Sequence, residues 1–222
     1  MGKENKDDSE KRSKAAYWND YYFKEKQSTL HWLPSQFATF CLGEIIEMGI
    51  SSIVEIAAGN GRDTLFFANN GMKVLATDNS LHSLELLEER VSQHRNIEVS
   101  FRDATEKMRD ITRRPNESLA FYARFFIHTL TQNELEMFFI SVTDAMSTND
   151  KLLLEYRNEE DATKSKVTDA HFRSFYAAEK VSLLATNNNL KLMYEVSGTG
   201  LAKWKSDDAS VTRQIFSYVG SN

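Results

Sequence analysis

The sequence contains very little cysteine and proline, with one cysteine and two prolines among 222 residues. A single cysteine, Cys41, excludes an internal disulfide framework and a structural metal site built from several thiolates. The chain also lacks an apolar run of the roughly 18 residues that span a bilayer, and its start, MGKENKDDSEKRSK, lacks the apolar segment of a secretory signal. We therefore expect a cytoplasmic protein that contacts no membrane.

An excess of positive charge is absent as well. Lys and Arg number 27 against 32 Asp and Glu, which gives a net charge of −5. A molecule of this charge has no broad attraction to nucleic acid, so we expect no nucleic-acid partner. The 41% of hydrophobic and 27% of charged residues are typical of a folded globular protein.

Three regions of the chain differ in composition and in the spacing of their apolar residues. Residues 1–14 are almost wholly polar, and such a segment buries too little apolar surface to offset its ordering entropy, so it is predicted to be a disordered tail. Residues 15–50 contain aromatic residues and apolar residues at helical spacing, which predicts two helices joined by a turn. No linker follows, so 15–222 is predicted to be a single domain in which 51–222 form the core.

Strand-like and helix-like segments alternate through this core, which indicates βαβ units and a mainly parallel sheet. The expected strands are 52–57, 73–78, 97–101, 118–125, 151–157, 190–198 and 213–219. The expected helices are 62–69, 81–94, 132–146 and 169–188.

The stretch VEIAAGNGRDT, residues 54–64, predicts a strand, a tight glycine turn and a helix start. Glycines in such a turn let a ligand approach the backbone, and the amides at the helix start face the ligand. A dinucleotide fingerprint would need a third glycine where this chain has Thr64, so a pyrophosphate ligand is disfavoured. A nicotinamide-binding protein remains the alternative for this domain.

Three elements together resemble the class I S-adenosylmethionine-dependent methyltransferases. Residues 55–61, EIAAGNG, are similar to motif I of that family, with Ala57 in place of its usual glycine. The second family element is a strand that ends in an acid, and LATD, which ends at Asp78, is similar to it. The third element also contains an acid, and FRDA, which contains Asp103, is similar to that one. The resemblance implies S-adenosylmethionine as cofactor, S-adenosylhomocysteine as product, and cofactor contacts from Glu55, Ala57, Gly59, Gly61, Arg62, Asp78, Asn79, Asp103 and Ala104.

The same resemblance implies a fold. That fold is a Rossmann-like three-layer α/β sandwich with a seven-stranded, mostly parallel sheet and an antiparallel last strand. Residues 15–50 would form a helical lid over it, with Tyr17, Trp18 and Tyr22 facing the substrate. The alternative is that these aromatic side chains only pack the helices onto the sheet. No metal is expected, since no His or carboxylate cluster has ligand spacing.

The segment YARFFIH, residues 122–128, follows the fourth expected strand, where substrates meet α/β proteins. His128 is the candidate general base because its ordinary pKa lies near 6.5, and Arg124 is the second candidate catalytic residue. A structural role for His128 is the alternative. Many family members that methylate nitrogen have an Asn-Pro-Pro-Tyr element here, and its absence favours an oxygen acceptor.

Several basic residues follow this segment, and they suggest an anionic acceptor. Guanidinium groups bind phosphate or carboxylate through two parallel hydrogen bonds. The candidate substrate-binding set is Arg124, Arg157, His171, Arg173 and Arg213. The alternative is that each arginine pairs with a nearby acid of the chain.

We expect, then, O-methylation of a small anionic acceptor such as a phosphate, phosphonate or sugar derivative. A looser similarity links the chain to the methyltransferase branch of surface-glycan and phosphorus-containing modification pathways. Methylation of a protein, and a scaffold that binds the cofactor without turnover, are the alternatives. A monomer or a homodimer is expected.

Overall fold

The computed structural model describes residues 16, 17, 20, 33–106, 108, 110–164, 172–204 and 206–220. The predicted tail at 1–14 lies outside these residues, and so does most of the first helix predicted between 15 and 32. No helix among the described residues is long and apolar enough to cross a membrane.

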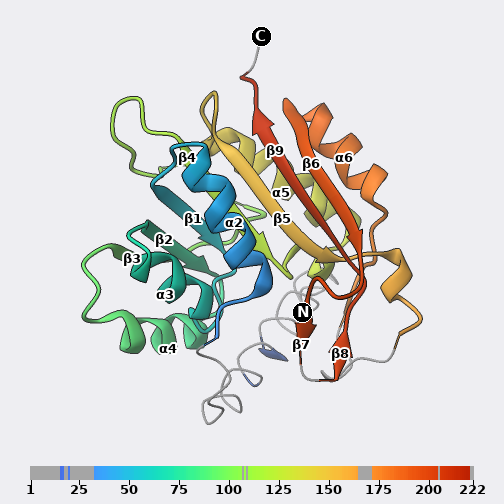
Figure 1. Ribbon diagram of the computed structural model, residues 1–222, viewed down its shortest axis with the longest axis horizontal. Coiled ribbons are helices and arrows are strands. Elements are labelled where there is room, and N and C mark those ends of the chain that lie inside the picture. Colours follow the sequence, from blue (N-terminus) through green and yellow to red (C-terminus); the bar gives the residue numbers. More distant parts are fainter. Residues whose placement is uncertain are drawn as a thin grey trace, which may run out of the picture.

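One seven-stranded sheet forms the centre of the molecule, in the order β3-β2-β1-β4-β5-β9-β6 (Figure 1). Strand β9 pairs antiparallel with both β5 and β6, while the other pairs are parallel. The prediction of a mostly parallel sheet with an antiparallel last strand is therefore confirmed. The strands are β1 (Ser52–Ile56), β2 (Lys73–Asp78), β3 (Ile97–Phe101), β4 (Leu119–Arg124), β5 (Lys151–Arg157), β6 (Leu190–Gly198) and β9 (Val211–Tyr218).

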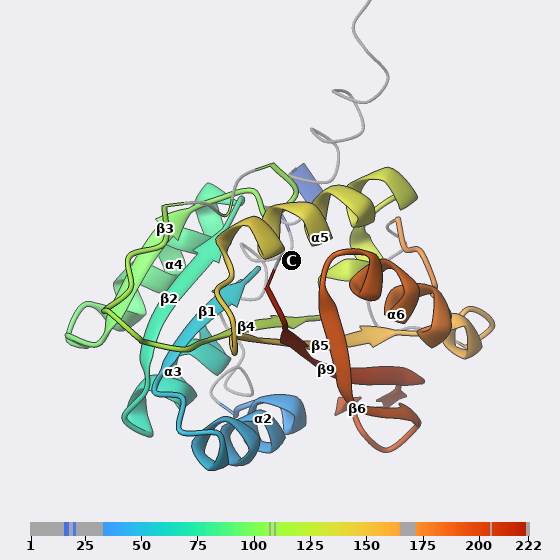
Figure 2. The same ribbon diagram turned by 90° about the horizontal axis from the view of Figure 1, so that it is seen from above.

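Helices cover both faces of this sheet, which gives the three layers predicted from the sequence (Figure 2). Apolar side chains of α2, α3 and α4 share one core cluster with the sheet, and those of α5 and α6 share the other. The helices are α2 (Gln36–Glu47), α3 (Arg62–Asn69), α4 (Leu81–Val91), α5 (Gln132–Ala145) and α6 (Ala178–Asn187). Short 3-10 turns occupy Ile127–Thr129 and Glu159–Asp161.

The helix predicted from residue 169 begins later than expected, at Ala178. Residues 165–171 lie outside the described part of the chain, and residues 172–177 are not helical. Tyr176 instead forms a parallel bridge with Asn158, and its hydroxyl donates to the Leu130 carbonyl at 2.7 Å. These long-range bonds hold the segment extended, and a local helical pattern does not reveal them.

A small second sheet was not predicted. Strands β7 (Lys203–Trp204) and β8 (Asp207–Asp208) form a short hairpin between β6 and β9. Figure 1 shows it beyond the end of the main sheet, on the side of the carboxyl ends of the parallel strands. Ala202, Ala209 and Val211 form a small core there, against which Phe125 packs.

Candidate functional site

The glycine turn between β1 and α3 has the conformation that a ligand-binding turn needs. Ala57, Gly59 and Gly61 have φ of 56°, 57° and 77°, in the left-handed region that favours glycine. A side chain at Gly61 would also place its Cβ 2.1 Å from Leu87 Cδ1. The turn is held to β2, because the Ala58 amide donates to the Thr77 carbonyl at 3.0 Å.

Asp78, at the end of β2, lies against this turn. Its carboxylate accepts hydrogen bonds from the Gly59 amide at 2.9 Å and from the Ser80 amide at 2.8 Å. Burial raises the pKa of Asp78, and hydrogen bonds from the amides of Ser80, Gly59 and Asn79 partly oppose that shift. A carboxylate has about four acceptor positions, so these amides leave acceptor capacity for a hydroxyl group of a ligand.

The third predicted element lies next to the second. The Asn79 side-chain amide donates to Asp103 at 3.3 Å, which joins the ends of β2 and β3. The other Asp103 oxygen accepts from the Thr105 amide and hydroxyl at 2.9 and 2.7 Å, and Ala104 between them is buried. The structure thus brings the glycine turn, Asp78 and Asp103 together along one edge of the sheet.

Glu55 supports the glycine turn from inside the protein. It is 3% exposed, and it accepts a hydrogen bond of 2.5 Å from the Thr64 hydroxyl on α3. Burial, with a further contribution from the charge of Asp63, raises the pKa of Glu55 well above the ordinary range. Arg62 lies outside the turn, 5.1 Å from the ring of Trp204 in the β7–β8 hairpin.

Asp63 has a role that the sequence did not indicate. It lies in the first turn of α3, whose N-cap is Gly61. Asp63 is buried and accepts hydrogen bonds from the Ser35 amide at 2.7 Å, the Ser35 hydroxyl at 2.8 Å and the Tyr122 hydroxyl at 2.9 Å. It therefore fixes the start of α2 beside the glycine turn, with Ser35 as the N-cap of that helix.

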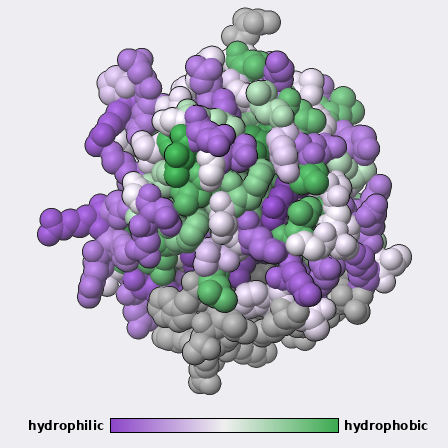
Figure 3. Space-filling view, viewed as in Figure 1, coloured by the Kyte–Doolittle hydropathy of each residue, from purple (hydrophilic) through white to green (hydrophobic). Residues whose placement is uncertain are grey.

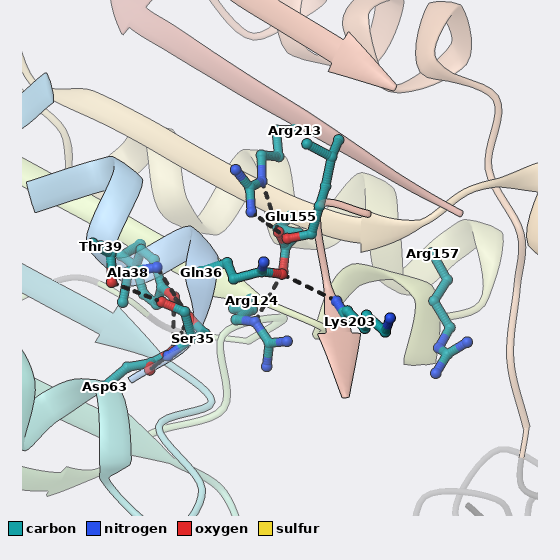
Figure 4. Close-up of polar contacts among 12 residues, drawn as sticks. Ser35, Gln36, Ala38, Thr39, Asp63, Arg124, Glu155, Arg157, Lys203 and Arg213 are labelled. Atoms are coloured by element: carbon teal, nitrogen blue, oxygen red, sulfur yellow. Dashed lines mark hydrogen bonds and ion pairs between the residues drawn. The ribbon is translucent and has the colours of Figure 1, made fainter. Parts of the chain in front are cut away.

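A row of charged residues crosses the neighbouring strands β4, β5 and β9. Arg124 is the register partner of Glu155, and Glu155 is the partner of Arg213. The Nε atoms of both arginines donate to the Glu155 carboxylate, each at 2.8 Å (Figure 4). Two guanidinium groups share one carboxylate, so the row keeps one surplus positive charge.

The predicted anion clamp of free arginines is not what the structure shows. Arg213 is held by Glu155 and by the Leu201 carbonyl, and Arg157 donates to Asp161 at 2.7 Å and also to Asp207. These arginines are buried against carboxylates of the same chain, so a substrate anion would compete with those partners. Arg124 differs: among the described residues, its two terminal nitrogens have no hydrogen-bond partner.

The other predicted substrate-binding residues are placed only in part. Arg173 is half-buried, and its burial, together with the charge of Arg157, lowers its pKa. Tyr17 is helical and half-buried. Trp18, Tyr22 and His171 lie outside the described residues.

His128 and Phe125 form the wall of the site beyond β4. Phe125 has φ of 53°, a strained value for an aromatic residue, and the Arg124 guanidinium lies 4.1 Å from its ring. His128 is 3% exposed, its ring is edge-on to Phe125 at 5.4 Å, and its Nδ1 faces the Arg157 amide at 3.5 Å. His128 is therefore packed behind Phe125 rather than open to the site.

Comparisons with known proteins agree with this geometry at the level of the fold. No family model and no curated protein sequence matches the chain. The glycopeptide N-methyltransferase MtfA complexed with sinefungin is similar, with 15% identity, a TM-score of 0.65 and coverage of 82% of this chain and 87% of that one. A methyltransferase dependent on S-adenosylmethionine from Clostridium acetobutylicum has 12% identity and a TM-score of 0.62, covering 94% and 99%.

A TehB-like methyltransferase from Corynebacterium glutamicum, also S-adenosylmethionine-dependent, has 10% identity and a TM-score of 0.65, covering 91% and 98%. At these identities the likeness shows a shared fold. The chain therefore has the Rossmann-like fold of the S-adenosylmethionine-dependent methyltransferases. Among the described residues, no group of three or more His, Cys, Asp or Glu side chains is placed to hold a metal ion.

Proposed function

We propose that this protein is an S-adenosylmethionine-dependent methyltransferase. The observation that carries the proposal is the meeting of three predicted elements at one sheet edge: the left-handed glycine turn, Asp78 bonded to the Gly59 amide, and Asp103 beside Asn79. A protein of similar structure supports it, since the structure of MtfA was solved in complex with S-adenosylmethionine, with S-adenosylhomocysteine and with sinefungin.

The residues at this edge fit that cofactor by their chemistry. The Asp78 carboxylate would accept both ribose hydroxyls, and the turn from Ala57 to Gly61 would lie against the ribose and the methionyl part. Asp103 and the Ala104 amide would hold the adenine. When bound, the cofactor supplies an electrophilic methyl group on a sulfonium, so this chain has to align an acceptor with it and exclude water.

We place the acceptor beyond β4 and β5, next to Arg124 and Phe125. The free end of the Arg124 guanidinium and the surplus positive charge of its row support a small anionic acceptor, such as a phosphate, phosphonate or sugar derivative. Phe125 and Phe126 stand where family members that act on nitrogen often have Asn-Pro-Pro-Tyr, which favours oxygen as the methylated atom.

The role of His128 as general base requires that the acceptor reach its ring past Phe125, because the ring is 3% exposed. His128→Gln tests this role. If His128 is the base, turnover falls by about 100-fold or more while the affinity for S-adenosylmethionine stays unchanged. Unchanged turnover would make His128 a structural residue that supports Phe125.

Calorimetric titration with S-adenosylmethionine tests the cofactor assignment. We expect binding by the intact protein, a loss of about tenfold or more in Asp78→Ala because a charge-assisted bond is removed, and no change in Asp144→Asn, an exposed carboxylate on α5. Circular dichroism would check that the Asp78 variant is folded. Absence of binding by the intact protein would overturn the proposal and favour a nicotinamide ligand.

Turnover separates the enzyme from its alternatives. Release of S-adenosylhomocysteine with a pool of small anionic metabolites would support the proposed acceptor class, and Arg124→Gln should then raise KM for the acceptor about tenfold while leaving cofactor affinity unchanged. Release only with protein acceptors would instead favour a protein methyltransferase. Cofactor binding without any turnover would favour a scaffold.

A further inference from the structure

A groove of about 400 Å³ lies on the edge of the sheet opposite to the glycine turn. It is lined by the first residues of four strands, among them Ser52 of β1, Lys73 of β2, Ile97 of β3 and Leu119 of β4. Strands β1, β2, β3 and β4 are parallel, so their first residues lie at one end of the sheet and their last residues at the other. The groove lies at the end where the strands begin and is therefore separate from the proposed cofactor site, which lies where they finish.

The groove lies where no helix of the described residues covers the sheet on the α5 and α6 face. The described residues between β3 and β4 contain no helix, and the chain there runs as an irregular segment, residues 110–118 (Figure 1). Val54 and Leu119 belong to the core on this face, and Leu75 and Ile111 pack against that core only partly buried. The floor of the groove is therefore apolar.

The wall of the groove is fixed in place. Glu117 accepts hydrogen bonds from the Ser52 hydroxyl at 2.6 Å and from the Arg114 amide at 2.7 Å. Arg113 donates to Asp150 at 2.8 Å and to the Ala145 carbonyl at 2.6 Å. Bonds to β1 and to the α5–β5 connection thus hold the irregular segment, as expected of a preformed binding groove.

Besides Arg113, which is bonded to Asp150, three cations from three separate elements line this groove: Lys73 at the start of β2, Arg95 before β3, and Arg114 in the irregular segment. All three side chains are exposed, and among the described residues none of them lies within ion-pair distance of an acid, although the charges of Lys73 and Arg114 help to lower the pKa of Glu117. Two acids also line the groove, Glu98 and the already bonded Glu117. Cations thus gather around an apolar floor on a chain whose net charge is −5.

We propose that this groove is a second binding site, for a small polyanion that carries two or more phosphate groups. Its volume is within the range of pockets that hold small molecules, roughly 300–1,000 Å³. Lysine and arginine are the side chains that recognise phosphate, and three of them on three separate elements can contact more than one phosphate group. This site does not depend on the proposed methyltransferase activity.

Calorimetry with sodium tripolyphosphate at low salt tests the site, because this probe contains no adenosine and so does not imitate the cofactor. We expect binding by the intact protein that weakens at higher salt, and a loss of at least tenfold when Lys73→Gln, Arg95→Gln and Arg114→Gln are combined. Lys191→Gln on β6, an exposed lysine outside the groove, should bind as the intact protein does.

Two further outcomes decide what the site is. Asp78→Ala should keep full tripolyphosphate binding, and the triple variant should keep its affinity for S-adenosylmethionine. The two results distinguish a failure of the groove proposal from a failure of the proposed cofactor site. Absence of binding by the intact protein, binding that survives the triple substitution, or binding lost in Asp78→Ala would overturn the proposal. Tighter binding of a short RNA strand in the same groove would also overturn it.

Discussion

Ala57 and Phe125 adopt the left-handed backbone conformation at the carboxyl ends of adjacent strands, with φ of 56° and 53°. This conformation costs an L-residue roughly 1–2 kcal/mol, and such strain gathers at sites where the backbone must meet a ligand. The two residues mark the two halves of the proposed site, Ala57 at the methyl donor and Phe125 at the acceptor.

Ala57→Gly should stabilise the protein. Glycine removes the energetic penalty of the left-handed conformation, but it also makes the unfolded chain more flexible, which lowers stability by a smaller amount. The free energy of unfolding should therefore rise by about 0.5–1 kcal/mol. Urea unfolding would measure the change. Ala58→Gly is the matched control, because φ of Ala58 is not positive, and it should lower stability by about 1 kcal/mol. Equal losses in both variants would contradict the assignment of strain.

Glu55 should make stability depend on pH. Its pKa is raised in the folded protein, so the folded state holds its proton more tightly than the unfolded state does. The stability it contributes is complete below the unfolded pKa of about 4.3 and is lost as the pH rises from there through the raised folded pKa.

Glu55→Gln should therefore flatten the pH profile of stability above about pH 4.3 and raise the free energy of unfolding at neutral pH, because glutamine has no charge to bury. Glutamine keeps an oxygen that accepts the hydrogen bond from the Thr64 hydroxyl. Urea unfolding at several pH values would show the difference, with Glu136→Gln on the exposed side of α5 as the control. A slope identical to that of the unchanged protein would contradict the burial argument.

At the scale of elements, the β7–β8 hairpin is the part of the site whose position depends most on side-chain contacts. Asp207 at the start of β8 bonds to Arg157 of β5, and Trp204 at the end of β7 lies over Arg62 beside the glycine turn. The hairpin thus joins the proposed acceptor side to the donor side.

Asp207→Asn should loosen this hairpin without unfolding the protein. Arg157 keeps its bond to Asp161, and asparagine keeps an acceptor oxygen, so the loss is the charge of one hydrogen-bond partner, about 1 kcal/mol, and hydrogen exchange of the β7 and β8 amides should accelerate about fivefold. Asp208→Asn is the control, since that exposed carboxylate accepts one bond, from the Gly200 amide. Exchange that stays unchanged in Asp207→Asn would show that the apolar contacts to Phe125 hold the hairpin alone.

The sequence predicted elements well where local pattern decides them. The ranges of β2, β3, β5 and β6 agree with the prediction to the residue, because each contains several apolar residues and has Gly, Asn or Asp close to its ends. The partners of the arginines could not be predicted, because Arg124, Glu155 and Arg213 meet only through the register of three strands far apart in sequence. The helix predicted from 169 failed for the same reason, since Tyr176 is held by Asn158 and Leu130.

At the scale of the whole molecule, the site is supported by two apolar cores on opposite faces of one sheet. The surface seen in Figure 3 mixes hydrophilic and hydrophobic side chains, and exposed apolar residues such as Ile46 and Met193 lie on α2 and on the edge strand β6. A register irregularity between Leu192 and Tyr194 in β6 interrupts the free edge, a feature that discourages pairing with another sheet.

The two cores should unfold together, because neighbouring residues of β5 belong to different ones. Leu153 is buried in the core beneath α2, α3 and α4, and Leu154 in the core beneath α5 and α6. A cavity on either side removes support from the strand that both cores share. Leu153→Ala and Leu154→Ala should each lower the free energy of unfolding by about 2–5 kcal/mol.

In both variants, urea unfolding followed by circular dichroism and by tryptophan fluorescence should give one coincident transition, as expected of a single cooperative domain. This would also test the prediction that residues 15–222 form one domain. A plateau in Leu153→Ala that Leu154→Ala lacks would instead show that the face carrying α2 and the glycine turn unfolds on its own, so that the proposed cofactor edge would be the less stable half.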